Sequence, residues 1–69
     1  MDRQYIESSA ITSVGYDANA SILEIEFKSG VIWEYSDVPE NVYHELMSGS
    51  VGKYFHAHIK DQYSANQVG

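Results

Sequence analysis

The residues of this chain with the clearest potential for chemistry are three basic side chains in its last third. Lys53, His56 and Lys60 stand at positions i, i+3 and i+7, a spacing that lines residues up along one side of an α-helix. The two lysines are half of the four lysine and arginine residues in the chain. Such a stripe could contact phosphate groups, with aromatic rings nearby to stack on unpaired bases. More often, such a stripe is simply the solvent-exposed face of a helix.

Two other patterns resemble chemical motifs but lack parts that those motifs need. His56 and His58 flank one residue, so on a helix their rings would point about 200° apart. No carboxylate stands four residues from either histidine to complete a metal site. The stretch from Gly49 to Lys53 resembles a phosphate-binding loop, but its glycines are too close together and no serine or threonine follows the lysine. The sequence therefore predicts no metal site and no cofactor.

Acidic side chains are plentiful, yet their placement does not favour catalysis. Glu24, Glu26 and Glu34 alternate with apolar residues, which puts them on the solvent face of a β-hairpin. There they favour solubility and protect the edge of the sheet. A domain of this size also has little room for a pocket that excludes water. We therefore predict a protein that is not an enzyme and has no catalytic residues.

Length and charge limit the classes of protein to which the chain can belong. Its 69 residues suffice for a single domain, and it has no cysteine for a disulfide or a thiolate metal site. The formal net charge of −6 disfavours binding to nucleic acids and other polyanions. No apolar run is long enough for a membrane span, and the polar start is no signal peptide. We expect a cytoplasmic protein that does not contact membranes.

The stretch 23–35 organises the rest of the predicted fold. Apolar and charged residues alternate on both sides of Gly30, which is typical of a β-hairpin with one buried face. A three-residue loop at 28–30 keeps the apolar side chains together and places Gly30 where such a loop needs a positive φ. The predicted pairs are Phe27 with Val31, Ile25 with Trp33 and Leu23 with Tyr35.

A further strand precedes this hairpin. The turn between them centres on Asn19 and Ala20, and Asn19 can take a left-handed conformation. The predicted pairs are Tyr16 with Leu23, Val14 with Ile25 and Thr12 with Phe27. These partners fall on the buried face of the hairpin, so we predict a three-stranded antiparallel meander. Its strands lie near 11–17, 22–28 and 31–36.

The hydrophobic period becomes helical after the last of these strands. Pro39 suits the first position of one helix, and Ser50 can cap a second. We expect helices near 39–48 and 51–60, with His58 partly buried on the inner side of the second. Both helices are needed to cover one face of the sheet, which gives an α+β fold of the order β-β-β-α-α.

Taken in order, the motifs of this chain resemble the KTSC domain, a small module named after its occurrence at the C-terminus of some lysyl-tRNA synthetases. The motifs are Gly15-Tyr16-Asp17, Leu23-Glu24-Ile25-Glu26-Phe27, Ser29-Gly30, Trp33-Glu34-Tyr35, Asp37-Val38-Pro39, Ser50-Val51-Gly52-Lys53-Tyr54-Phe55 and Ile59 to Tyr63. We take this region as a single domain at 8–63, with loose termini at 1–7 and 64–69. The family usually has two tyrosines flanking one residue, and here Trp33 stands in place of the first.

The function that the resemblance implies is limited. The family also occurs as free-standing bacterial proteins but is generally treated as of unknown function, and its RNA binding is suggested from the synthetase context alone. We predict a small binding module for a protein partner; the alternative is a weak single-stranded RNA-binding domain. The candidate binding residues are Trp33, Tyr35, Lys53, His56 and Lys60. The predicted register places Trp33 and Tyr35 on the face that the helices cover, which weighs against their stacking on a base.

Overall fold

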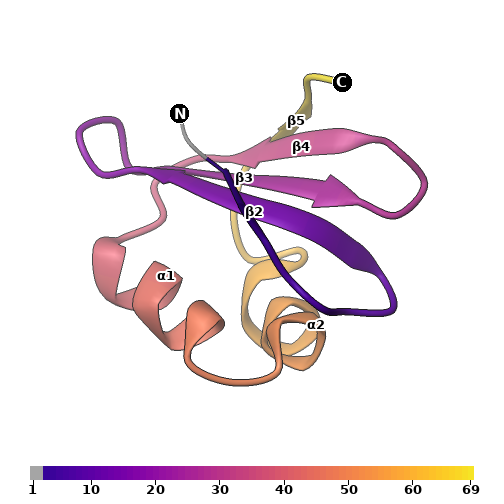
Figure 1. Cartoon of the computed structure of the whole chain (residues 1–69). Coiled ribbons are helices and arrows are strands. Elements are labelled where there is room, and N and C mark those ends of the chain that lie inside the picture. Colours follow the sequence, from indigo (N-terminus) through magenta and orange to yellow (C-terminus); the bar gives the residue numbers. More distant parts are fainter. Residues whose placement is uncertain (1–2) are drawn as a thin grey trace.

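The computed structural model describes residues 3–69, which form a five-stranded antiparallel sheet with helices on one face (Figure 1). The strands lie in sequence order across the sheet. Their bounds are β1 Arg3–Tyr5, β2 Ile11–Asp17, β3 Ile22–Phe27, β4 Ile32–Tyr35 and β5 Ala65–Gln67. The helical segments are α1 Glu40–Met47, α2 Val51–Tyr54 and the π-helix η1 Phe55–Ile59. The predicted α+β class is confirmed, with two more strands than the predicted meander.

The hairpin of β3 and β4 has the predicted register. The predicted pairs are present: Leu23 with Tyr35, Ile25 with Trp33, and Phe27 with Val31. The N–H of Phe27 donates a hydrogen bond to the carbonyl oxygen of Val31 at 2.9 Å, which closes the loop. Gly30 has a φ of 95°, the positive value that the three-residue loop requires. The side chains of Leu23, Ile25, Trp33 and Tyr35 therefore share one face.

Strand β2 pairs with β3 in a register that differs from the prediction at one end. Two predicted pairs are confirmed, Tyr16 with Leu23 and Val14 with Ile25. The third was wrong: Ile11 lies opposite Phe27, because a β-bulge adds one residue, Thr12, to β2. The bulge turns Ile11 onto the covered face, where it is 1% exposed. It also keeps the hydroxyl of Thr12 out of the core.

The turn between β2 and β3 begins at Asp17. A carboxylate oxygen of Asp17 accepts hydrogen bonds from the N–H groups of Asn19 at 3.0 Å and Ala20 at 3.2 Å. The positive φ belongs to Ser21, at 56°, and not to Asn19 as predicted. The carbonyl oxygen of Ser21 accepts the N–H of Val38 at 2.9 Å. This partner is distant in the sequence, so the local pattern could not reveal it.

The two edge strands lie in segments that we expected to be loose. β1 pairs with β2, and Nη1 of Arg3 donates to Oε1 of Glu24 at 2.8 Å. β5 pairs with β4, with Gln67 opposite Trp33. Every residue of both strands is exposed, so neither strand has the buried alternation by which a strand is found in a sequence. Residues 1 and 2 of the predicted loose N-terminus lie outside the described part of the chain.

Two helical stretches follow β4 near the predicted positions, but the second is not a single α-helix. α2 continues into η1, where the N–H of Lys60 donates to the carbonyl oxygen of Phe55 at 2.8 Å, five residues back. The wider turn advances fewer degrees per residue than an α-helix does. As a result Phe55 and Ile59 are buried while His58 is exposed. The prediction that His58 is partly buried was therefore wrong.

The helical segments lie beneath the sheet, and the core is the layer between them (Figure 1). The buried apolar side chains are Ile11, Val14, Leu23, Ile25, Tyr35, Val38, Leu46, Phe55 and Ile59. Trp33 points to the same face as Tyr35 but is only partly buried, on the strand next to the edge strand β5. In residues 3–69 no helix is long and apolar enough to cross a membrane.

Candidate functional site

Four of the five predicted binding residues line one pocket, which we call the aromatic pocket. Its volume is about 350 Å³. Its lining residues are Phe27, Trp33, Tyr35, Phe55, His56, Lys60, Asp61, Tyr63 and Ala65. Trp33 and Tyr35 come from β4, whereas His56 and Lys60 come from η1 and the residue that follows it. The fifth predicted residue, Lys53, lines a different groove.

The ring of Phe55 organises the buried side of the aromatic pocket. Its centroid lies 5.5 Å from that of Phe27 and 5.6 Å from that of Tyr35, with interplanar angles of 68° and 78°. Such edge-to-face contacts are favourable between aromatic rings. Because Phe55 is 3% exposed and Tyr35 is 7% exposed, neither ring has a free face for a ligand. Trp33 is partly exposed, so the predicted aromatic pair is divided between the core and the pocket wall.

Asp61 also lines the aromatic pocket, although the sequence analysis did not single it out. It follows the end of η1 and has a φ of 66°, a conformation that aspartate adopts more readily than most residues. Burial of Tyr35, together with the negative charge of Asp61, raises the pKa of Tyr35 above its ordinary value of 10.0. An acid shortly after a helix is a common turn residue, so its position gave no signal of a site.

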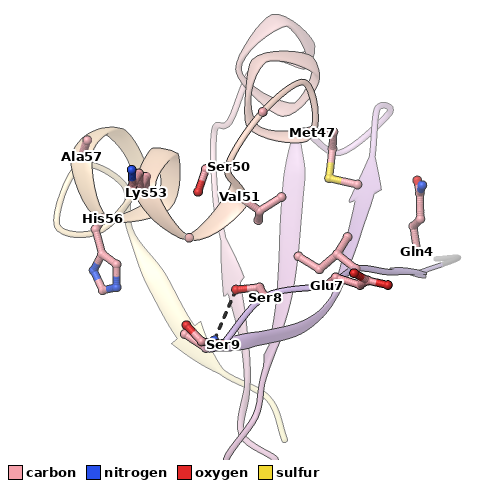
Figure 2. Close-up of a pocket in the computed structure, with 14 residues that line it drawn as sticks. Gln4, Glu7, Ser8, Ser9, Met47, Ser50, Val51, Lys53, His56 and Ala57 are labelled. Carbon is pink, nitrogen blue, oxygen red and sulfur yellow. Dashed lines mark hydrogen bonds between the residues drawn. The ribbon is translucent and has the colours of Figure 1, made fainter.

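A larger concavity than the aromatic pocket lies between the β1–β2 connector and the helices, and we call it the connector groove (Figure 2). It is open to solvent and has a volume of about 860 Å³. Its lining residues are Gln4, Ile6, Glu7, Ser8, Ser9, Ala10, Met47, Gly49, Ser50, Val51, Gly52, Lys53, His56 and Ala57. Figure 2 shows the side chains of Met47 and Val51 pointing toward the connector.

Ser8 holds the connector side of this groove in place. Its hydroxyl oxygen accepts hydrogen bonds from the N–H groups of Ala10 at 3.2 Å and Ile11 at 3.3 Å. A Cβ atom on Gly52 would lie 3.6 Å from the same oxygen, so α2 passes within ordinary contact distance of the connector. The groove is therefore bounded by a hydrogen-bonded turn on one side and by helix on the other.

The three basic residues of the predicted stripe are exposed but are not brought to a single site. Lys53 lines the connector groove and Lys60 the aromatic pocket, while His56 lines both. The change from α- to π-helical geometry after α2 alters the angular spacing on which the stripe was predicted. Neither lysine forms an ion pair with any of residues 3–69.

The two concavities are suited to binding by their shape. Both are open to solvent, and both combine apolar side chains with a few charged groups. Within the part of the chain that the structure describes, no three His, Cys, Asp or Glu side chains are grouped so that they could hold a metal ion. The described residues that line the two concavities offer contact surfaces and charges.

An antiparallel sheet with helical segments on one face defines a small α+β domain as the class of this protein. The family model of the KTSC domain matches residues 7–63, and the chain belongs to the KTSC domain family. The resemblance inferred from the ordered motifs is thereby confirmed.

Relatives of two kinds share this domain. A protein of Stutzerimonas stutzeri (strain A1501), described as uncharacterized, is 39% identical over 64 residues, or 91% of this chain and 90% of that protein. A lysine–tRNA ligase of Nostoc sp. (strain PCC 7120) is 41% identical over 63 residues, which are 90% of this chain but 11% of the ligase. The chain therefore corresponds to a small part of that enzyme.

A solved structure shows the same fold. The crystal structure of a KTSC domain protein from Yersinia pestis matches this structure with a TM-score of 0.95 and 36% sequence identity. The match covers 99% of this chain and 97% of that one, so it includes both edge strands. The five-stranded arrangement is thus shared with a relative.

Proposed function

We propose that this domain is a non-enzymatic protein-binding module that takes up an extended peptide segment along the free edge of β1. The observation that carries the proposal is the position of this edge. β1 is the outer strand of the sheet, and it borders the connector groove. Main-chain pairing with an edge strand, combined with side-chain pockets beside it, is a recurring mode of peptide recognition.

The hydrogen-bonding groups of β1 alternate in direction. The N–H of Ile6, just after the strand, donates to the carbonyl oxygen of Thr12 at 3.1 Å. By alternation, the N–H of Tyr5 points to the open edge. The side chain of Tyr5 is 77% exposed, whereas Gln4 and Ile6 contribute to the lining of the groove. An added strand would therefore find both a main-chain donor and a groove for its side chains.

The groove beside this edge has an apolar floor and a mixed rim. Ile6, Met47 and Val51 supply apolar surface, and Glu7 and Lys53 carry opposite charges on its two sides (Figure 2). An added strand would direct every second side chain into the groove. The occupant we propose is thus an extended segment with apolar residues at alternating positions. The open shape suits binding better than a reaction from which water must be excluded.

Composition and relatives are compatible with the cellular setting that we propose for this interaction. The chain has no cysteine, which is compatible with the cytoplasm as the location that we propose. A similar segment occurs in a lysine–tRNA ligase, where it makes up 11% of the enzyme. A module that recognises protein segments could serve equally in a larger enzyme or by itself.

Replacing Tyr5 by proline tests strand addition directly. Proline removes the N–H that faces the open edge and is tolerated on edge strands, so the pairing of β1 with β2 should persist. Tyr5→Ala is the matched control, because it removes the same exposed ring but keeps the N–H. Peptides are selected against the wild-type protein from a displayed random library, and their affinities for the three proteins are measured by calorimetry. We expect Tyr5→Pro to weaken binding about tenfold and Tyr5→Ala to change it less than about threefold.

The possible results separate the mode of binding from the function itself. Equal affinities of wild type and Tyr5→Pro for the selected peptides would contradict strand addition but leave a protein-binding module. A selection that yields no binding peptide would contradict the proposed function. Circular dichroism of both variants checks that the sheet is intact.

Single-stranded RNA binding is the second candidate, because a relative of this domain is part of a lysine–tRNA ligase. Phosphate contacts from Lys53 and Lys60 would make the affinity depend only weakly on salt. The slope of log K against log salt concentration is about −0.7 per phosphate contact for single strands. The net charge of −6 opposes the approach of RNA. Labelled single-stranded RNA is titrated at low salt against wild type and a Lys53→Ala/Lys60→Ala double variant. Binding that the double variant loses would support this candidate, and equal responses or none would exclude it.

A further inference from the structure

The aromatic pocket contains ring surface that the core does not use. Among residues 3–69, neither Trp33 nor Tyr63 stacks on another aromatic ring, and both are only partly buried. Both line the aromatic pocket together with Phe27, which is also partly buried. The volume of about 350 Å³ falls in the range of sites for small ligands. The pocket can therefore admit a compact chemical group against these rings.

The charges at the aromatic pocket differ in how firmly they are held. Asp61 belongs to a turn with a φ of 66°, and its negative charge acts on the hydroxyl group of the buried Tyr35. Lys60 and Asp61 are both exposed, but the short side chain of Asp61 keeps its carboxylate near the backbone, whereas the long side chain of Lys60 can turn toward solvent. The net charge of −6 also draws cations toward the protein and repels anions. The positioned charge and the surrounding field thus both favour a positively charged occupant.

We propose that the aromatic pocket binds an alkylated ammonium group, as found in quaternary ammonium compounds and in methylated lysine side chains. Aromatic ring faces carry partial negative charge and attract such cations. The carboxylate of Asp61 adds a full negative charge beside them. The aromatic pocket shares only His56 with the connector groove, so the site does not depend on strand addition at β1.

A planar anion, such as a nucleotide with its phosphate on Lys60, is the competing occupant. Its base could stack on Trp33 or Tyr63, so ring surface alone does not separate the two occupants. Its phosphate, however, would have to approach Asp61 in an acidic domain. The two occupants have opposite requirements: a cation is favoured by Asp61 and disfavoured by Lys60, and an anion the reverse. Substitution of these two residues therefore distinguishes them.

Trp33 is the only tryptophan of the chain, so tryptophan fluorescence reports directly on the aromatic pocket. Choline chloride is titrated into the wild-type protein while this emission is recorded, with sodium chloride as the control for ionic strength. The neutral alcohol in which carbon replaces the nitrogen of choline has the same shape without the charge. We expect a saturable response to choline and about threefold to tenfold weaker binding of the alcohol.

Two substitutions with opposite expected effects test the charge preference. Asp61→Asn removes the carboxylate while asparagine still tolerates the left-handed turn, and it should weaken choline binding about threefold to tenfold. Lys60→Gln removes the neighbouring ammonium and should strengthen binding about twofold. Glu34→Gln is the matched control, since it changes the net charge as Asp61→Asn does but lies on the opposite face of the sheet from Trp33. It should leave the affinity within about twofold.

Several outcomes would overturn the proposal. A response to choline that does not saturate, or that sodium chloride reproduces, means that no cation site exists. Weaker choline binding by Lys60→Gln would contradict the charge preference, and tighter binding of a nucleoside monophosphate than of choline would assign the pocket to an anion. If the site binds choline, a second titration tells whether the natural ligand is a methylated lysine side chain or a free quaternary ammonium compound. Its probe is trimethyl-lysine with an acetylated N-terminus and an amidated C-terminus. Tighter binding than that of choline indicates a protein side chain, and weaker binding indicates a free small molecule.

Discussion

Tyr35 belongs both to the core and to the aromatic pocket. Its ring packs edge to face against Phe55, with the centroids 5.6 Å apart, and it is 7% exposed. Its hydroxyl group lies within the influence of the charge on Asp61. Tyr35, a candidate binding residue that the predicted register placed on the covered face, thus packs in the core, and it links the stability of the fold to the charge at the pocket.

Stability should therefore decline in alkaline solution partly through Tyr35. Burial and the charge of Asp61 raise its pKa above 10.0, so above that pH the unfolded chain releases this proton before the folded chain does. The folded state then holds more protons, and the free energy of unfolding falls as the pH rises through the folded-state pKa. Urea unfolding measured from about pH 8 to about pH 11 should show this decline.

Tyr35→Phe is the control for this prediction, because it keeps the ring and removes the titrating hydroxyl. Its alkaline loss of stability should be smaller than that of the wild type. Some loss should remain, since burial and the charge of Glu45 also raise the pKa of Tyr54. An alkaline decline of equal size in both proteins would contradict the assignment to Tyr35.

At the scale of secondary structure, two irregular elements determine which residues reach the core and the pocket. The bulge in β2 brings Ile11 onto the covered face in place of Thr12. The π-helix η1 buries Phe55 and Ile59 and leaves His58 in solvent. Bulges and π-helices are both over-represented next to functional sites. Here the π-helix contributes residues to both concavities.

Two glycines should respond oppositely to alanine because they occupy different elements. Gly30 has a φ of 95° in the β3–β4 loop, so Gly30→Ala should destabilise the protein by about 1–2 kcal/mol. Gly52 lies in α2, and a Cβ there would meet only the hydroxyl oxygen of Ser8 at an ordinary 3.6 Å. Gly52→Ala should therefore stabilise by about 0.5–1 kcal/mol. The midpoints of urea unfolding measure both effects, and shifts of the same sign would contradict the argument.

At the scale of the whole molecule, the sheet has two short edge strands with different neighbours. The family match covers residues 7–63, so both β1 and β5 lie outside it. β5 lies beside β4 and next to Trp33, while β1 borders the connector groove. The domain limits of 8–63 remain a prediction, and removal of β5 tests the C-terminal limit.

A chain that ends at residue 64 should still fold. The residues of β5 are all exposed, so their removal deletes main-chain hydrogen bonds but little buried apolar surface. We expect a loss of about 1–3 kcal/mol in the free energy of unfolding, measured in urea. The exposed edge of β4 should also promote self-association, which size-exclusion chromatography detects. An unfolded truncated chain would show that the domain must include β5.

Features that depend on neighbouring residues could be predicted from the sequence alone. The β3–β4 register follows from a few alternating side chains and from Gly30, because a strand directs successive residues to opposite faces. The helical stretches near 39–48 and 51–60 follow from apolar spacing and from Pro39 and Ser50 directly before them. Pro39 is the N-cap of α1 and not its first residue as predicted, and the side chain of Ser50 makes no capping hydrogen bond. In each case residues a few positions apart decide the structure, so backbone geometry is sufficient.

Features that depend on distant segments were decided only by the tertiary structure. The edge strands consist of exposed residues, so they form only because β2 and β4 offer main-chain partners. The aromatic pocket joins Trp33 to Asp61, and the connector groove joins Glu7 to Lys53. The sequence supplied four residues of the aromatic pocket but not their separation from Lys53. Lys53 and the aromatic pocket are separated because the helices pack on the sheet in a particular way and because the second helical stretch contains a π-helical turn. Both features depend on contacts between the layers and not on local periodicity.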